Sequence, residues 1–262
     1  MKNKLILIFA GVFALVMIFS VYRLISIGRA TTRSETAFDK LRADLESADE
    51  KTAAESRNGE TDTESVLFPA EPVIIPEYET LYAGNADFVG WIKIADTRID
   101  YPVMQTKDDP EYYLRKAYDG TYDIHGTPFL DSRCDLRAAD NYIIYGHHMR
   151  DGTMFADLMK FTDADFCRSD PEIRFDTLYE RGVWHVVTVF KISADAVDVF
   201  PYNRFSDFSS GEYSAADYIA RCRPYAIWYD DSVDTEGKKL LTLSTCDYTY
   251  ENGRLVVVAV SD

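Results

Sequence analysis

The residues best suited to chemistry lie near the C-terminus. Cys246 ends the run LLTLSTC, where the sequence changes from β-type to polar, so its thiol is expected to be rigidly held and reachable. Asn252-Gly253 predicts a tight turn, and Arg254 opens the next apolar run. If the two runs pair antiparallel, Cys246 and Arg254 lie together. A guanidinium is a poor base, but it can stabilise a thiolate or an oxyanion. The alternative is an arginine that protects a sheet edge.

A cysteine nucleophile needs a base, because a free thiol is only a few per cent thiolate at neutral pH. Of the four histidines, His125 lies in a Gly-containing loop, and His185 alternates within VWHVVTVF, which predicts a packed strand residue. His147 and His148 follow the strand-like NYIIYG. Adjacent strand residues point to opposite faces, so at most one of this pair can face a shared site. The residues alone do not decide which one.

The other cysteines have a structural interpretation. Cys134, Cys167 and Cys222 are expected to be small buried hydrophobes. Four cysteines are too few for a disulfide scaffold, and no C-x-x-C pair indicates zinc. If Cys246 stays reduced, at most one intramolecular bridge can form. No metal site and no cofactor are expected.

The elements that would position these side chains are mostly strands. Short β-type runs separated by turn signals begin at Phe88, and their spacing favours a closed barrel or a sandwich over alternating βαβ units. The expected helices are few: 110–116, 153–159 and Ser214–Arg223, the last with Ala215, Ile219 and Cys222 on one face. The expected strands are 88–95, 98–104, 128–130, 141–145, 173–178, 183–192, 239–245 and 254–260.

The N-terminus carries an uncharged run of 18 residues, Leu5–Tyr22. As a helix it is roughly 27 Å long, close to the roughly 30 Å hydrocarbon core of a bilayer. A signal peptide normally has a shorter apolar region and an A-x-A-like cleavage site, so an uncleaved membrane anchor is favoured. Basic residues stand on both sides of the run, so the positive-inside rule does not orient it.

The segment after the anchor is acidic. Thr32-x-x-Glu35 predicts a capping box, and Phe38, Leu41 and Leu45 recur at helical spacing in a stripe too narrow and too charged for a core helix. A stalk or weak helix is expected, followed by a polar linker over 52–65 and prolines at 69, 72 and 76. The predicted organisation is an anchor with its flanks (1–29), an acidic stalk and linker (30–76) and a catalytic domain (77–262).

Composition excludes some classes of function. Hydrophobic residues make up 47% of the 262 residues, which is enough for a core. The net charge is −16, with 28 basic residues against 44 acidic ones, and four of the basic residues lie in the first 29 positions. An acidic body repels phosphate backbones, so no nucleic-acid partner is expected.

Several segments together resemble the sortase family. TLSTC at 242–246 with NGR at 252–254 resembles the catalytic cysteine and arginine motif, and NYIIYGHHMRDGTMFADL at 141–158 resembles the catalytic histidine segment. GWIKIADTRIDYPVMQ at 90–105 and GTPFLD at 126–131 resemble the early strands. The form of the histidine segment and the helix-forming insertion near 213–223 resemble class B in particular. His148 stands where relatives often carry asparagine.

The resemblance implies a closed eight-stranded sortase-type β-barrel with added helices behind a single-pass anchor. It implies Cys246 as nucleophile, His147 as catalytic histidine and Arg254 as catalytic arginine. It also implies transpeptidation outside the cell, with the N-terminus cytoplasmic. The substrates would be secreted proteins with a C-terminal sorting signal cleaved after a threonine through a thioester, and the acceptor would be a peptidoglycan precursor amine. Tyr145 shares the strand face of His147. The expected groove residues are Tyr145, Leu114, Ser244 and Thr245, with core packing as the alternative for Tyr145 and Leu114.

Other classes of protein remain as rivals. One is another cell-wall cysteine enzyme, such as an L,D-transpeptidase or a papain-like endopeptidase, although the latter usually places its cysteine before the histidine, at the start of a helix. Another is a non-catalytic anchored barrel with an inert cysteine, which rapid alkylation would contradict. The last is a receptor-type ectodomain on a stalk.

Overall fold

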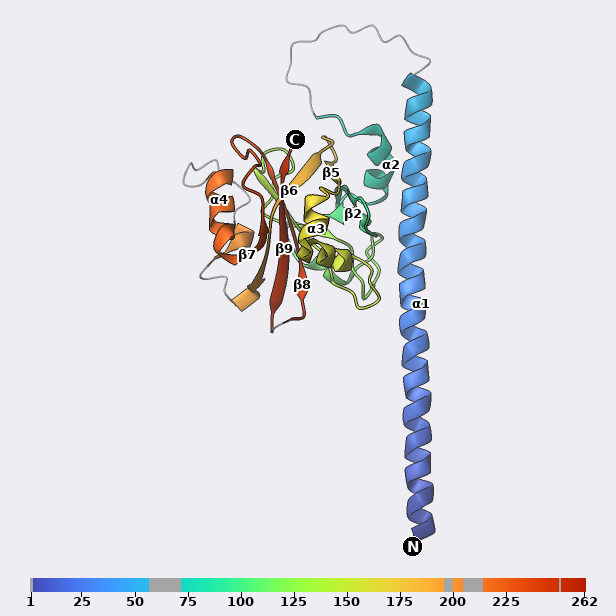
Figure 1. The fold of residues 1–262 in the computed structure, drawn as a ribbon. Helices are drawn as coiled ribbons and strands as arrows, with labels where there is room; N and C mark the ends of the chain where they lie inside the picture. The colour runs from blue at the N-terminus through green and yellow to red at the C-terminus, as the bar shows by residue number, and fades with distance from the viewer. Residues whose placement is uncertain (1, 57–71, 196–199, 205–213, 250) are drawn as a thin grey trace.

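The longest element of the chain is a single N-terminal helix. The computed structural model describes residues 2–56, 72–195, 200–204, 214–249 and 251–262. Helix α1 (Lys2–Ser56) is continuous, and its N-terminal part extends far beyond the rest of the molecule (Figure 1). By length and composition, it supplies the one candidate membrane span found among the described residues (Gly11–Lys51, mean hydropathy 1.9). The capping box predicted at Thr32 is wrong, because the helix does not begin there and Thr32 Oγ1 donates to the Gly28 carbonyl oxygen one turn earlier, at 3.0 Å.

The body is a closed β-barrel, as predicted. The strands follow the order β5-β1-β2-β3-β4-β8-β9-β6-β7, and an additional pairing of β5 with β6 closes eight of them into a ring. Strand β7 lies outside the ring, paired with β6. The strand bounds are β1 Phe88–Ile94, β2 Asp100–Met104, β3 Phe129–Leu130, β4 Asn141–Tyr145, β5 Ile173–Thr177, β6 Val183–Ser193, β7 Ala226–Tyr229, β8 Leu240–Asp247 and β9 Gly253–Ser261.

All eight predicted strands are present, and β7 is the one that the sequence pattern missed. It has four residues, follows directly on a 3₁₀ turn, and is largely half-buried, so it carries no alternation of buried and exposed positions. Its pairing with β6 alone explains why it exists. Such an edge strand is specified by its neighbour rather than by its own sequence.

The described helices lie around the outside of the barrel (Figure 1). Those besides α1 are α2 (Pro76–Gly84), α3 (Ala164–Arg168), α4 (Ala215–Cys222) and the 3₁₀ segments η1 (Tyr112–Arg115), η2 (Phe155–Thr162), η4 (Tyr202–Arg204) and η5 (Arg223–Tyr225). Helix α4 agrees with its prediction: Ser214 caps it in a capping box, and the expected face, Ala215, Ile219 and Cys222, is buried. The helix expected over 153–159 is a 3₁₀ segment that starts later, because Met154 has a positive φ of 56°.

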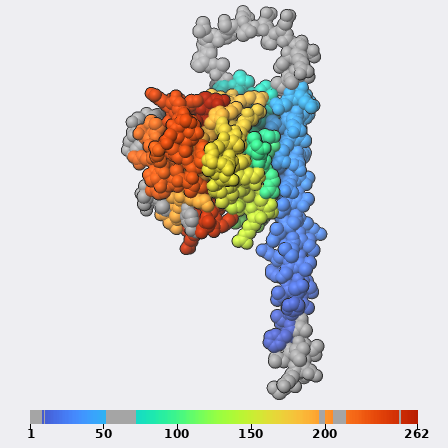
Figure 2. Space-filling view, viewed as in Figure 1, coloured from blue at the N-terminus to red at the C-terminus, as the bar shows by residue number. Residues whose placement is uncertain are grey.

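The C-terminal part of α1 lies along one side of the barrel (Figure 2). The stripe predicted to belong to a stalk or weak helix packs there: Phe38 is 4% exposed, with its ring centroid 5.1 Å from that of Tyr101. Arg42 Nε donates to the Asp100 carbonyl oxygen at 3.1 Å. Of the predicted linker, residues 57–65 lie outside the described residues, as does the proline at 69.

Candidate functional site

One pocket in the barrel wall gathers every residue that the sequence singled out for the site. It has a volume of about 460 Å³, lies where β4 and β8 end and β9 begins, and is bounded on another side by η1. The predicted residues that line it are Leu114, Tyr145, His147, Ser244, Thr245, Cys246 and Arg254.

Cys246 and Arg254 stand directly opposite each other in the antiparallel pairing of β8 with β9, so the expectation that these two residues lie together is confirmed. Asn252 adopts a positive φ of 53° at the end of the turn, and Gly253 is already the first residue of β9, opposite Asp247. Arg254 is also paired with Ile192 of β6, so it lies on an interior strand, and the sheet-edge interpretation of this arginine is wrong. Both side chains are half-buried.

His147 reaches the same pocket through a different pairing. Strand β4 runs parallel to β8, with Tyr145 opposite Ser244, so His147 and Cys246 each lie two residues beyond this pair. The ring Nε2 of His147 lies 2.8 Å from the Leu114 carbonyl oxygen. A carbonyl can only accept, so Nε2 carries a hydrogen, and Nδ1 is the ring nitrogen left to exchange a proton with a substrate.

The environment of His147 favours its neutral form. Burial lowers the pKa of this imidazole, and the hydrogen bond to the Leu114 carbonyl opposes the effect. The positive charges of Arg115 and His125 lower the pKa further. The backbone is fixed as well, because the Phe155 N–H donates to the His147 carbonyl oxygen at 2.8 Å.

His148 points elsewhere, as strand alternation requires for one of the pair. Its Nδ1 lies 2.9 Å from the carbonyl oxygen of Cys246, and its ring lies 5.0 Å from that of Tyr248. It is not among the residues that line the pocket. This placement supports His147 as the histidine that faces the site and gives His148 a role in holding the backbone of Cys246.

The remaining histidines lie in carboxylate pairs. The prediction that His185 is a packed strand residue is wrong: its side chain is 39% exposed and lies between Asp170 and Asp262, with nitrogen–oxygen distances of 2.8 and 2.6 Å. It lies near the start of β6, where an outward-facing position meets solvent. His125, by contrast, is buried between two aspartates.

Two of the predicted groove residues use their hydroxyls inside the protein. Ser244 Oγ lies 2.8 Å from Tyr202 Oη, and Thr245 Oγ1 donates to the Gly146 carbonyl oxygen at 2.8 Å. Both residues are buried, so their hydroxyls hold the strands around the pocket. Leu114 and Tyr145 are half-buried.

Sequence reasoning missed a polar network on the pocket wall. Tyr145 Oη donates to Asp131 Oδ2 at 2.9 Å, and the same carboxylate receives two hydrogen bonds from the Arg133 guanidinium, at 2.8 and 2.6 Å. Arg133 also donates to the Asn203 carbonyl oxygen at 2.5 Å. The Asp131-Ser132-Arg133 tripeptide was the available signal, because its carboxylate and guanidinium are close in sequence.

The four cysteines divide as predicted. Cys134, Cys167 and Cys222 are buried, and burial raises the pKa of Cys134 to about 12 and that of Cys167 to about 11. Cys246 is the one that is half-exposed, and all four are free thiols. Within the part of the chain that the structure describes, no cluster of three or more His, Cys, Asp or Glu side chains is arranged to hold a metal ion.

A reachable thiol, an imidazole and a guanidinium around one pocket of a closed barrel define a cysteine enzyme that transfers acyl groups. The Sortase domain family model matches residues 92–262, and the chain belongs to the sortase family, within class B. It is therefore a cysteine transpeptidase, and the papain-like and non-catalytic interpretations are set aside.

Relatives agree in sequence and in structure. Sortase B of Listeria monocytogenes is 37% identical over 190 residues, which cover 69% of this chain and 72% of that protein. Sortase B of Staphylococcus aureus is 31% identical over 187 residues, which cover 70% and 74%. The solved Staphylococcus aureus sortase B–substrate complex superposes with a TM-score of 0.69 and 27% identity, covering 88% of this chain and 97% of that one.

Proposed function

We propose that this chain is a single-pass membrane sortase whose nucleophile is Cys246. The enzyme cleaves the C-terminal sorting signal of secreted proteins after a threonine and transfers them to an amine of a peptidoglycan precursor. The observation that carries the proposal is the opposition of Cys246 and Arg254 in one pocket with His147. The family supports sorting-signal substrates, wall amine acceptors and a place at the cell surface.

The first half-reaction forms the acyl-enzyme. The Cys246 thiol gives its proton to Nδ1 of His147, the resulting thiolate attacks the threonine carbonyl carbon, and the carbonyl electron pair moves to oxygen. The Arg254 guanidinium, with a backbone N–H near Cys246, stabilises this oxyanion. When the tetrahedral intermediate collapses, the carbon–nitrogen bond breaks, and the departing amine takes a proton from Nδ1 of the His147 imidazolium. A thioester on Cys246 and a neutral His147 remain.

The second half-reaction restores the enzyme. The acceptor amine attacks the thioester carbonyl carbon and gives a proton to Nδ1 of His147, and the thiolate of Cys246 leaves. Water resolves the thioester less productively. The low pKa of His147 suits this step, because a neutral imidazole is the form that accepts a proton. No cofactor takes part in the scheme.

The anchor and its orientation belong to the same proposal. The apolar part of α1 is long enough to cross a bilayer as one helix, and its residues 11–29 are exposed. We place the N-terminus in the cytoplasm and the barrel outside the cell, where secreted substrates and wall precursors meet. The residues around the active site then act close to the outer face of the membrane.

The experiment is to trap the thioester. Full-length protein in detergent is mixed with a library of sorting-signal peptides, quenched in acid and analysed by mass spectrometry. We expect acylation of Cys246 and of no other cysteine. The buried Cys134, Cys167 and Cys222 are internal controls. Cys246→Ala should abolish turnover. Full activity of this variant, or an acyl group on another residue, would refute the scheme.

A further inference from the structure

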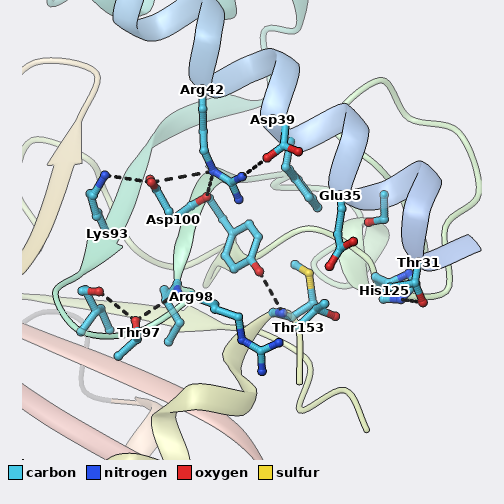
Figure 3. Close-up of a pocket in the computed structure, with 16 residues that line it drawn as sticks. Thr31, Glu35, Asp39, Arg42, Lys93, Thr97, Arg98, Asp100, His125 and Thr153 are labelled. Carbon is cyan, nitrogen blue, oxygen red and sulfur yellow. Dashed lines mark hydrogen bonds and ion pairs between the residues drawn. The ribbon is translucent and has the colours of Figure 1, made fainter. Parts of the chain in front are cut away.

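A second histidine is enclosed beside the pocket. The side chain of His125 is 1% exposed, and its two ring nitrogens face different carboxylates: Nδ1 lies 2.8 Å from Asp123 Oδ1, and Nε2 lies 3.0 Å from Asp151 Oδ2. Figure 3 shows His125 beside Thr31, which projects from α1. Thr31 Oγ1 donates to the same Asp151 oxygen at 2.9 Å and lies 3.3 Å from His125 Nε2.

This geometry favours a charged ring. A neutral imidazole has one N–H donor, so one of the two carboxylates would face a nitrogen lone pair. An imidazolium donates to both. Burial lowers the pKa of His125, but the hydrogen bonds and negative charges of Asp123 and Asp151 outweigh it, and the pKa is raised above its ordinary value. Hydrogen bonds from Thr153 and His125 likewise overcome the effect of burial on Asp151 and lower its pKa to about 2.

Other charged groups surround the cluster. Glu35 of α1 and Arg98 of the β1–β2 turn line the same cavity as His125 (Figure 3). Ser34, buried on α1, helps to hold Asp123 as a carboxylate. On the active-site side, the positive charge of His125 acts on the His147 ring and lowers its pKa.

The cluster joins the two segments that hold His147. Asp123 and His125 belong to the segment that follows η1, and Gly126 in that segment passes so close to Leu114 that an added Cβ would lie 2.5 Å from the Leu114 carbonyl oxygen. That oxygen is the acceptor for His147 Nε2.

Asp151 belongs to the other segment, the loop that carries His147 itself. Its second carboxylate oxygen orders this loop by accepting from the N–H and the hydroxyl of Thr153, at 3.1 and 2.7 Å. A bond between His125 and Asp151 therefore fixes the ring acceptor of His147 relative to the backbone of His147.

We propose that Asp123 and Asp151 hold the buried His125 in a carboxylate–imidazolium–carboxylate clasp that positions His147 for proton transfer. The role of His147 itself rests on the proposed function. The clasp touches no reacting atom, so its members are positioning residues. It has two effects: it holds the Leu114 carbonyl against His147, and it places a fixed positive charge near that ring.

Nuclear magnetic resonance of the full-length protein in detergent, labelled with ¹⁵N at its four histidines, tests the clasp without any substrate. At pH 6.5 the wild-type His125 ring should have both nitrogens protonated. His125→Gln removes the charge and one of the two donors, so the pKa of His147 should rise. A neutral His125 in the wild-type protein would overturn the proposal whether or not any variant folds.

Kinetics with a peptide that the wild-type enzyme cleaves complete the test. His125→Gln should lower kcat about tenfold with little change in KM, as expected when a proton donor is misplaced. Asp151→Asn, which preserves shape, should lower kcat as well. Unchanged kcat and unchanged His147 pKa in a folded His125→Gln or Asp151→Asn variant would contradict the clasp.

His185→Gln is the matched control, because His185 also lies between two aspartates but sits near the start of β6 and does not line the active-site pocket. It should change neither the His147 pKa nor kcat, and an effect equal to that of His125→Gln would overturn the proposal. Because the protonation of His125 is measured without turnover, a failure of the clasp is distinguishable from a failure of the proposed function, which Cys246→Ala tests.

Discussion

Tyr145 and Ser244 stand directly opposite each other in the parallel pairing of β4 with β8. This single register brings together His147 and Cys246, which are almost a hundred residues apart in the chain. The hairpin of β8 and β9 then adds Arg254. The site is therefore built at the junction of a parallel and an antiparallel strand pair, and each of its three groups can be tested separately.

The two adjacent histidines should differ in their effect on turnover. His147→Ala is expected to lower kcat by a factor of about 10²–10⁴, because it removes the group that exchanges protons with the substrate. His148→Ala should lower kcat less than tenfold, because His148 holds the Cys246 carbonyl from outside the pocket. Steady-state cleavage of a sorting-signal peptide measures both variants. Loss confined to His148→Ala would refute the assignment.

Arg254 should act on the transition state rather than on binding. Arg254→Ala is expected to lower kcat by about 10²–10³ with KM little changed, as for the loss of an oxyanion donor. Arg254→Lys should retain part of the activity, because it keeps the charge without the planar fork. Arg168→Ala, which removes an exposed arginine with an ion pair to Asp165, is the control and should match the wild type. Equal kcat values for Arg254→Ala and the wild type would contradict this role.

Glycine should be required at position 146 for stability and turnover, because there is no space for a side chain at this position. A Cβ at this position would lie 2.5 Å from the ring of Phe155, and the residue directly precedes His147. Gly146→Ala should lower the free energy of unfolding by about 1–3 kcal/mol and should also lower kcat.

Gly237→Ala provides a matched comparison, since no atom lies within 4 Å of its Cβ position although its φ is +68°. Its backbone strain should reduce stability by about 1 kcal/mol and leave kcat unchanged. Denaturant unfolding and peptide cleavage measure both effects. A normal kcat in Gly146→Ala would show that the loop tolerates the displacement.

The stabilising effect of the clasp should depend on pH in two directions. The raised pKa of His125 means that its contribution is complete below about 6.5 and is lost as pH rises through the raised value. The pKa of Asp151, lowered to about 2, means that its contribution is complete above 3.8 and is lost as pH falls toward 2. The Tm difference between wild type and His125→Gln should be largest between these limits. A Tm difference that stays constant from pH 5 to pH 9 would contradict this pH dependence.

Local patterns of residues were sufficient to predict much of the fold. Short β-type runs and the turn signals between them located the eight barrel strands, because β-branched and aromatic residues favour strands while Gly, Pro, Asn and Asp favour turns. The Asn252-Gly253 signal predicted a turn between the two C-terminal strands, and their antiparallel pairing, with Gly253 already opposite Asp247, places Cys246 opposite Arg254. The missed strand β7 and the wrongly predicted cap at Thr32 are cases in which a neighbouring element overrode the local signal.

The sequence by itself thus predicted Cys246 as the nucleophile and Arg254 as its partner, and it determined the candidate anchor and the resemblance to a family. Only the tertiary structure placed His147 rather than His148 in the pocket, set the Leu114 carbonyl against its ring, packed Phe38 of α1 on the barrel and enclosed His125 between two carboxylates. Each of these contacts joins residues distant in the chain. Such contacts depend on how whole elements pack against one another, and this packing cannot be predicted from a local pattern of residues.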